Sequence, residues 1–76
     1  MPRLSARKPQ DLAAVIRAAR EESGLSQAEL ADRLGFSRDY MIGLESGQPN
    51  TYATRLFRVL HELGITIDVD YPDHDV

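Results

Sequence analysis

The side chains best suited to bind a ligand are concentrated in one short segment, from Ser37 to Ser46. Arg38 offers a planar fork of N–H donors that fits a guanine edge or a phosphate, and Asp39 offers carboxylate oxygens that can accept from cytosine. On a 100° helical wheel, Met41 and Leu44 define the inner side of this segment. The candidate binding residues lie at its start, on its opposite side and on its flanks: Ser37, Arg38, Asp39, Tyr40, Ile42, Gly43 and Ser46.

Structural roles are also open for several of these side chains. Arg38 and Asp39 can be a solvated charge pair at the start of a helix, and Tyr40 can simply be packed. Ser26 and Gln27 begin the preceding helix, where free backbone N–H groups and the positive end of the helix dipole attract a phosphate. We therefore count both as candidate binding residues, although Ser26 can equally do no more than cap.

Four helices are predicted to position these residues. Apolar residues at helical spacing and capping residues place them at about 9–23, 26–34, 37–46 and 51–63, each followed by a glycine, and Thr51 is the expected cap of the fourth. The side chains predicted to face inward are Leu30, Ala31 and Leu34 in the second helix and Leu56, Val59, Leu60 and Leu63 in the fourth.

Residues 27–44 fit a helix-turn-helix. Ala31 is small where the two helices must cross closely, and Gly35 stands where the turn requires a left-handed residue. The apolar positions of the motif are supplied by Leu30, Leu34, Phe36, Met41 and Leu44. An ordinary helical hairpin is the alternative, but it needs neither the small crossing residue nor this turn length. In a helix-turn-helix the second helix enters the major groove of DNA, so its N-terminal residues approach the base edges.

An ion pair is predicted beneath the motif. Glu45 falls on the inner side of its helix, where an unpaired carboxylate would be costly, and Arg20 lies at the edge of the buried stripe of the first helix. We expect Arg20 and Glu45 to pair and to serve a structural role.

The C-terminal segment changes to a period of two, which is typical of a half-buried strand. The alternating apolar residues are Ile65, Ile67, Val69 and Tyr71. Because no other strand is recognised in the sequence, this one is expected to pair with the same strand of a second copy, antiparallel across a two-fold axis. A frayed tail and pairing with residues 3–5 are the alternatives.

The charge distribution permits a nucleic-acid partner despite a net charge of −3. Four aspartates lie in the last nine residues, so residues 1–67 carry nine basic against eight acidic side chains, a net charge of +1. We divide the chain into a basic N-terminal arm (1–8), the DNA-binding domain (9–64), a dimerising strand (65–71) and an acidic tail (72–76).

Other chemistry is sparse. The chain has no cysteine, which excludes disulfides and thiolate metal sites. His61 is expected at the surface, and Asp73, His74 and Asp75 are expected to be solvated rather than metal-binding. No phosphate-binding loop or nucleophile–base pair is recognised, so we expect neither enzymatic activity nor a cofactor or metal. Without an apolar run long enough for a bilayer, the protein is expected in the cytoplasm, associated with the nucleoid.

The chain resembles the Xre family of lambda-repressor-like helix-turn-helix regulators. The resemblance is carried by Gly24-Leu25-Ser26-Gln27-Ala28-Glu29-Leu30-Ala31, Gly35-Phe36-Ser37 and Glu45-Ser46-Gly47. More narrowly it resembles HipB-type antitoxins, through Asn50-Thr51, Thr54, Leu56-Phe57-Arg58-Val59-Leu60 and the strand from Ile65 to Tyr71.

The resemblance implies a homodimer that binds operator DNA of its own operon and associates with a HipA-like serine/threonine kinase toxin. In the family, the positions of Gln27, Arg38, Asp39 and Gly43 commonly touch DNA, and those of Arg20 and Glu45 form an inner ion pair. Ile42 and Gly43 replace the usual polar residues. Specificity is therefore expected to rest on Arg38, Tyr40 and DNA shape.

The predicted fold is mostly α, a lambda-repressor-like bundle of four or five helices with one C-terminal strand that pairs across a homodimer. The predicted function is a sequence-specific repressor that binds a near-palindromic operator, with recognition helices about 34 Å apart. Two alternatives are a module that sequesters a kinase and binds little DNA, and a free-standing phage-type or metabolic repressor.

Overall fold

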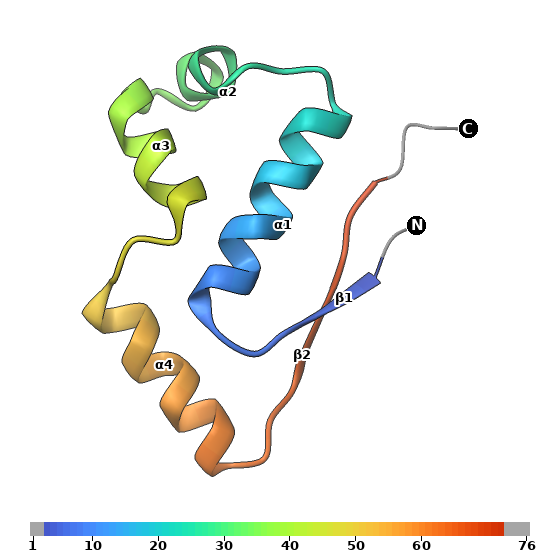
Figure 1. Cartoon of the computed structure of the whole chain (residues 1–76), viewed down its shortest axis with the longest axis vertical. Helices are drawn as coiled ribbons and strands as arrows, with labels where there is room; N and C mark the ends of the chain where they lie inside the picture. Colours follow the sequence, from blue (N-terminus) through green and yellow to red (C-terminus); the bar gives the residue numbers. More distant parts are fainter. Residues whose placement is uncertain (1–2, 73–76) are drawn as a thin grey trace.

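The computed structural model describes residues 3–72. Within them the chain forms four helices and two short strands. In chain order these are β1 (Arg3–Ala6), α1 (Pro9–Glu22), α2 (Gln27–Leu34), α3 (Arg38–Ser46), α4 (Thr51–Glu62) and β2 (Ile67–Asp70). Helix α1 lies between the α2–α3 pair and the two strands, and α4 diverges from the other helices after an extended loop (Figure 1). No helix within residues 3–72 is long and apolar enough to cross a membrane.

Side chains cap the three later helices. Ser26 accepts a hydrogen bond from the backbone N–H of Glu29, whose carboxylate in turn accepts from the N–H of Ser26, so α2 begins with a complete capping box. Helix α4 is capped by Asn50, whose side chain accepts from the N–H of Ala53 at 3.0 Å. The prediction of Thr51 as this cap was wrong by one residue, because an Asn side chain accepts at this position as well as a Thr hydroxyl does.

The two strands pair with each other within the chain. They run antiparallel, with Leu4 opposite Val69 and Ala6 opposite Ile67. The hydroxyl of Ser5 also donates to the Asp68 carboxylate at 2.9 Å. Pairing in cis satisfies the backbone groups of β2 that face β1, without the entropic cost of bringing a second molecule to them.

This arrangement corrects the prediction that the C-terminal strand pairs across a homodimer. The alternative of pairing with residues 3–5 is the one observed, and it extends to Ala6. Strand β2 is also shorter than predicted. It contains Ile67 and Val69, whereas Ile65 and Tyr71 lie outside Ile67–Asp70. The N-terminal strand was considered only as an alternative partner, because Arg3–Ala6 is too short to establish a period of two.

The core within residues 3–72 is small. Its buried apolar residues are Ala6, Ala13, Val15, Ala31, Met41 and Phe57. Helix α4 contributes Phe57 alone, so the prediction that Leu56, Val59 and Leu63 are buried was wrong, as was the prediction for Leu34. The apolar residues of α4 form one wide arc around the helix, and the chain's own core covers only the edge that carries Phe57. Leu60 is half-buried beside it.

Candidate nucleic-acid interface

The turn between α2 and α3 is closed by two backbone hydrogen bonds. The N–H of Phe36 donates to the carbonyl of Ala31 at 2.9 Å, and that of Gly35 donates to the carbonyl of Asp32 at 3.3 Å. This is a Schellman motif, which requires a left-handed residue, and Gly35 has φ +74°. Ser37, two residues after Gly35, is the N-cap of α3. The turn therefore holds α3 at a fixed angle to α2.

The hydroxyls that begin α2 and α3 are well placed for an anion. Ser26 and Ser37 each accept one backbone N–H, from Glu29 and Tyr40 respectively, both at 3.0 Å. In that arrangement the oxygen accepts, and each hydroxyl keeps its own hydrogen for donation to a phosphate. The backbone N–H of Ser26 lowers the pKa of Glu29 and is the larger cause, so this carboxylate stays ionised in the cap. Both serines thus cap a helix and can also bind a phosphate.

Arg38 and Asp39 extend into solvent from the first turn of α3. Across residues 3–72, neither side chain takes part in an ion pair or a hydrogen bond. Tyr40 is 56% exposed and its ring meets that of Phe36 edge to face, with centroids 5.2 Å apart. Both aromatic rings are therefore partly packed on each other and partly accessible, and the binding role of Tyr40 stays a prediction.

The predicted binding residues of α3 fall on two sides of the helix. On one side Ile42 and Ser46 line a hollow of about 250 Å³ together with Gln27. On the other side, a groove of about 670 Å³ separates α3 from α1 and α4, and we call it the central groove. Its lining includes Ser37, Asp39, Tyr40 and Gly43. The structure thus brings Gln27, Ile42 and Ser46 together and places Ser37, Asp39, Tyr40 and Gly43 at the edge of a different cavity. Arg38 lines neither of the two.

Arg20 and Glu45 form a bidentate ion pair, the arrangement that the sequence predicts. Arg20 Nε donates to Glu45 Oε2 at 2.7 Å and Nη2 to Oε1 at 2.9 Å, while Nη1 donates to the carbonyl of Leu25 at 2.7 Å. The Glu45 side chain is 2% exposed and that of Arg20 is 11% exposed. The hydrogen bonds from Arg20 lower the pKa of Glu45 against the opposing effect of burial, and those to Glu45 raise the pKa of Arg20. The pair ties α1 to α3.

Gln27 is connected to the same pair. Its side-chain N–H donates to Glu45 Oε1 at 3.2 Å, so the first residue of α2 is held against the last turn of α3. An amide NH₂ carries two hydrogens, and the second one stays available to a ligand. Sequence reasoning treated Gln27 only as a candidate phosphate contact and missed this structural bond.

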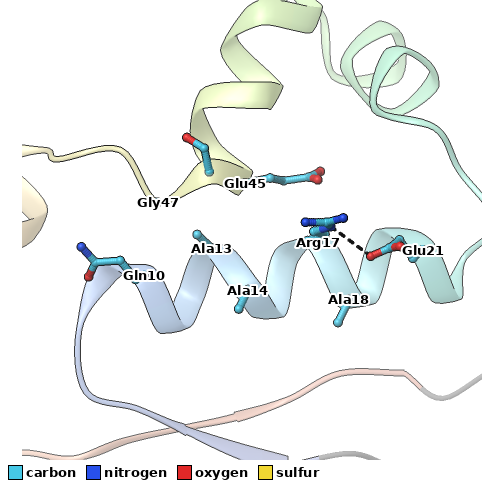
Figure 2. A pocket seen from close by; sticks show the side chains of 9 residues that line it. Gln10, Ala13, Ala14, Arg17, Ala18, Glu21, Glu45 and Gly47 are labelled. Atoms are coloured by element: carbon cyan, nitrogen blue, oxygen red, sulfur yellow. Dashed lines mark ion pairs between the residues drawn. The ribbon is translucent and has the colours of Figure 1, made fainter.

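Arg17 is a basic residue that the sequence reasoning did not single out. It lies on α1 beneath the end of α3, in an ion pair with Glu21 at 3.3 Å (Figure 2). Its side chain is 65% exposed and lines the hollow that contains Gln27 and Ser46. The available signal was its position three residues before Arg20, which places both guanidinium groups on one face of α1.

Residues 3–72 hold no group of three side chains that could bind a metal ion. His61 is exposed and makes an edge contact with the ring of Phe57 at 6.5 Å between centroids. The predicted solvated residues Asp73, His74 and Asp75 lie outside the described residues.

Comparison with known proteins agrees with this geometry. The chain is 36% identical over 64 residues, 84% of each chain, to the uncharacterized HTH-type transcriptional regulator y4mF of Sinorhizobium fredii (strain NBRC 101917 / NGR234). It is 38% identical over 47 residues to the uncharacterized HTH-type transcriptional regulator y4dJ of the same strain, covering 62% of this chain and 61% of the relative. No solved structure matches. Residues 11–64 match the helix-turn-helix domain family, and this chain belongs to that family.

Proposed function

We propose that this protein is a sequence-specific DNA-binding transcriptional repressor that inserts α3 into the major groove. The observation that carries the proposal is the position of Arg38 and Asp39. Both project from the first turn of the second helix of a helix-turn-helix, and neither has a side-chain partner within residues 3–72. In this motif that turn approaches the base edges, where a guanidinium can bind guanine and a carboxylate can accept from cytosine.

Other residues of the interface are assigned to the DNA backbone. The hydroxyls of Ser26 and Ser37 and the free N–H of Gln27 are donors at helix N-termini, which are favourable positions for phosphate. Arg17 adds an exposed positive charge beside Gln27. These contacts fix the orientation of α3 without reading sequence. Ile42 and Ser46 face the same hollow and can contact a base or sugar edge.

The repressor is proposed to act as a homodimer on a near-palindromic operator. Two copies related by a two-fold axis would place their α3 helices about one DNA turn, or about 34 Å, apart. A dimer also suits a chain with so small a core, because association buries apolar surface that the monomer leaves exposed.

The finer assignment is to the Xre family and, within it, to the HipB-type antitoxins. It rests on the sequence motifs that begin at Gly24 and on the segment from Asn50 to Leu60. Under this proposal the protein represses its own operon and neutralises a HipA-like kinase. Co-purification from the native host, with bound proteins identified and bound DNA sequenced, tests it. Recovery of operator DNA without a kinase would favour a free-standing repressor. Recovery of a kinase without DNA would favour a module that sequesters the kinase.

Direct DNA contact by α3 is tested by NMR. A ¹⁵N-labelled sample titrated with an operator duplex, selected from a random library, should show shifts of the amide resonances from Ser37 to Gly43. If these resonances stay unchanged while a remote surface responds, the proposed function is wrong. A matched titration at higher salt should weaken the shifts steeply, because phosphate contacts release counterions.

A further inference from the structure

Helix α4 presents a row of large apolar side chains to solvent. Four residues define what we call the α4 stripe, and their exposed fractions are 78% for Tyr52, 43% for Leu56, 54% for Val59 and 67% for Leu63. At 100° per residue they fall within an arc of about 60°, so they form one continuous surface. Monomeric proteins rarely leave a contiguous apolar surface of this kind uncovered.

The stripe is continuous with the central groove. Tyr52 and Leu56 line the groove together with Leu12 and Ile16 of α1 and Leu44 of α3. Tyr52 and Leu56 therefore belong both to the lining of the central groove and to the N-terminal half of the α4 stripe. A partner lying along α4 would cover the stripe and close the open side of the groove in a single contact.

The spacing of the stripe is symmetric along the helix. Tyr52 and Leu63 lie at equal distances from a point between Phe57 and Arg58, and so do Leu56 and Val59. A second copy of α4 lying antiparallel about that point would set Leu56 against the partner's Val59 and Tyr52 against the partner's Leu63. A patch that is its own complement is what a two-fold symmetric contact requires.

Two charged residues beside the stripe favour the same orientation. Arg55 and Glu62 lie on one edge of it, and within residues 3–72 neither forms an ion pair. In an antiparallel two-fold pair this edge meets itself, and Arg55 stands about 3 Å along the axis from the partner's Glu62 at 1.5 Å per residue. In a parallel pair Arg55 would instead face the opposite edge, which carries Ala53 and Leu60.

We propose that α4 is the homodimer interface, formed by antiparallel packing of the α4 stripe against the same stripe of a second copy. Two symmetric ion pairs, each between Arg55 and the partner's Glu62, border the contact. This inference rests on the homodimer of the proposed function, and it replaces the C-terminal strand as the contact surface. It also leaves the two strands paired within each chain, as the structure has them.

Sedimentation equilibrium of the full chain tests the apolar contact. The wild type should dimerise, and Val59→Lys should raise the dimer dissociation constant by about tenfold or more, because a charge replaces a buried side chain. Leu34→Lys is the matched control, since Leu34 lies on α2 and is 54% exposed, the same fraction as Val59. It should dimerise like the wild type, and far-UV circular dichroism should show that both variants keep their helices.

Charge reversal tests the orientation. Arg55→Glu and Glu62→Arg should each raise the dissociation constant by about threefold to tenfold, and the double variant should restore it to nearly the wild-type value. Arg58→Glu serves as the control, because Arg58 lies away from the stripe on the same helix. Rescue reports a contact between chains, because Arg55 and Glu62 are two helical turns apart within one chain.

The proposal is overturned if the wild type stays monomeric at every concentration, if Val59→Lys dimerises like the wild type, or if the double charge reversal gives no rescue. The DNA titration described above fails or succeeds separately. A monomeric Val59→Lys should still shift the resonances of Ser37 to Gly43 with a single half-site, only at higher DNA concentration. Loss of those shifts in the wild-type dimer would contradict DNA binding and leave the interface standing.

Discussion

The carboxylate of Glu45, in the last turn of α3, is held by two nitrogens of Arg20 from α1, at 2.7 and 2.9 Å. Gln27 adds a third hydrogen bond from α2, so one buried carboxylate connects three helices. Such a pair gives little net stability compared with an apolar contact, but removing one partner leaves an uncompensated buried charge. The ion pair therefore specifies how the helix-turn-helix sits on α1.

Glu45→Lys should unfold the domain. It places a second positive charge against Arg20, and breaking a buried pair costs about 3–5 kcal/mol, a large part of the stability of so small a domain. Thermal unfolding followed by circular dichroism measures the effect. Glu21→Lys is the control, because Glu21 forms only an exposed ion pair with Arg17 and should cost less than about 1 kcal/mol. A folded and stable Glu45→Lys protein would contradict the structural role.

The same pair predicts a loss of stability in acid. The pKa of Glu45 is lowered from 4.5 in the folded protein, chiefly by the hydrogen bonds from Arg20. Its contribution is therefore complete above pH 4.5 and is lost as the pH falls through the lower folded pKa. The free energy of unfolding of wild type minus that of Glu45→Gln should shrink from pH 7 to pH 3. Glu29 also has a lowered pKa, but it is present in both proteins, so its contribution cancels in the difference between their free energies of unfolding. A constant difference would contradict the prediction.

Arg38→Ala should reduce sequence discrimination without changing the fold. Arg38 is exposed and without an ion pair within residues 3–72, so its removal costs no packing. A bidentate contact to guanine contributes about 1–3 kcal/mol of discrimination, so the ratio of operator to random-duplex affinity should fall about fivefold or more. Fluorescence anisotropy measures both affinities. Arg33→Ala on α2 provides a control, and an unchanged ratio for Arg38→Ala would remove Arg38 from direct readout.

Truncation after Gly64 should destabilise each chain. It removes β2, so the backbone of β1 loses its partner and the buried Ala6 loses the strand opposite it. We expect a loss of about 1–3 kcal/mol, typical of a damaged buried contact. The loss should not depend on protein concentration, because the pairing lies within one chain. Thermal unfolding at two protein concentrations measures it. A loss that grows with protein concentration would point to strand pairing between copies instead, because the wild type alone would then be stabilised by association.

Local signals in the sequence were enough to place the helix-turn-helix. They were not enough to predict contacts between elements that are far apart in the chain. Ser26, Ser37 and the glycine at 35 act on their own neighbours, so their caps and turn could be predicted from spacing. The partner of β2 could not be predicted in this way, because β1 and β2 lie far apart in the sequence and meet only in the folded chain. The buried part of α4 could not be predicted either, since its apolar arc is wide and the sequence does not show which part of it the core covers. Arg20 and Glu45 were predictable because an inner charge requires an opposite one nearby.

Gly43→Ala tests why a glycine stands in the middle of α3. Either Gly43 admits close approach of the DNA backbone, or it has no role in the interface. A methyl group at this position would lie 3.2 Å from Gln48 Oε1, the end of an exposed and flexible side chain that can rotate away. Alanine is favoured over glycine in a helix interior by about 1 kcal/mol, so the variant should be more stable by up to this amount. Chemical denaturation measures the stability, and anisotropy measures operator affinity. If Gly43 admits close approach of the DNA backbone, affinity should fall while stability rises. Equal or better affinity would mean that the DNA does not need the space, and Gly43 would then have no place in the interface.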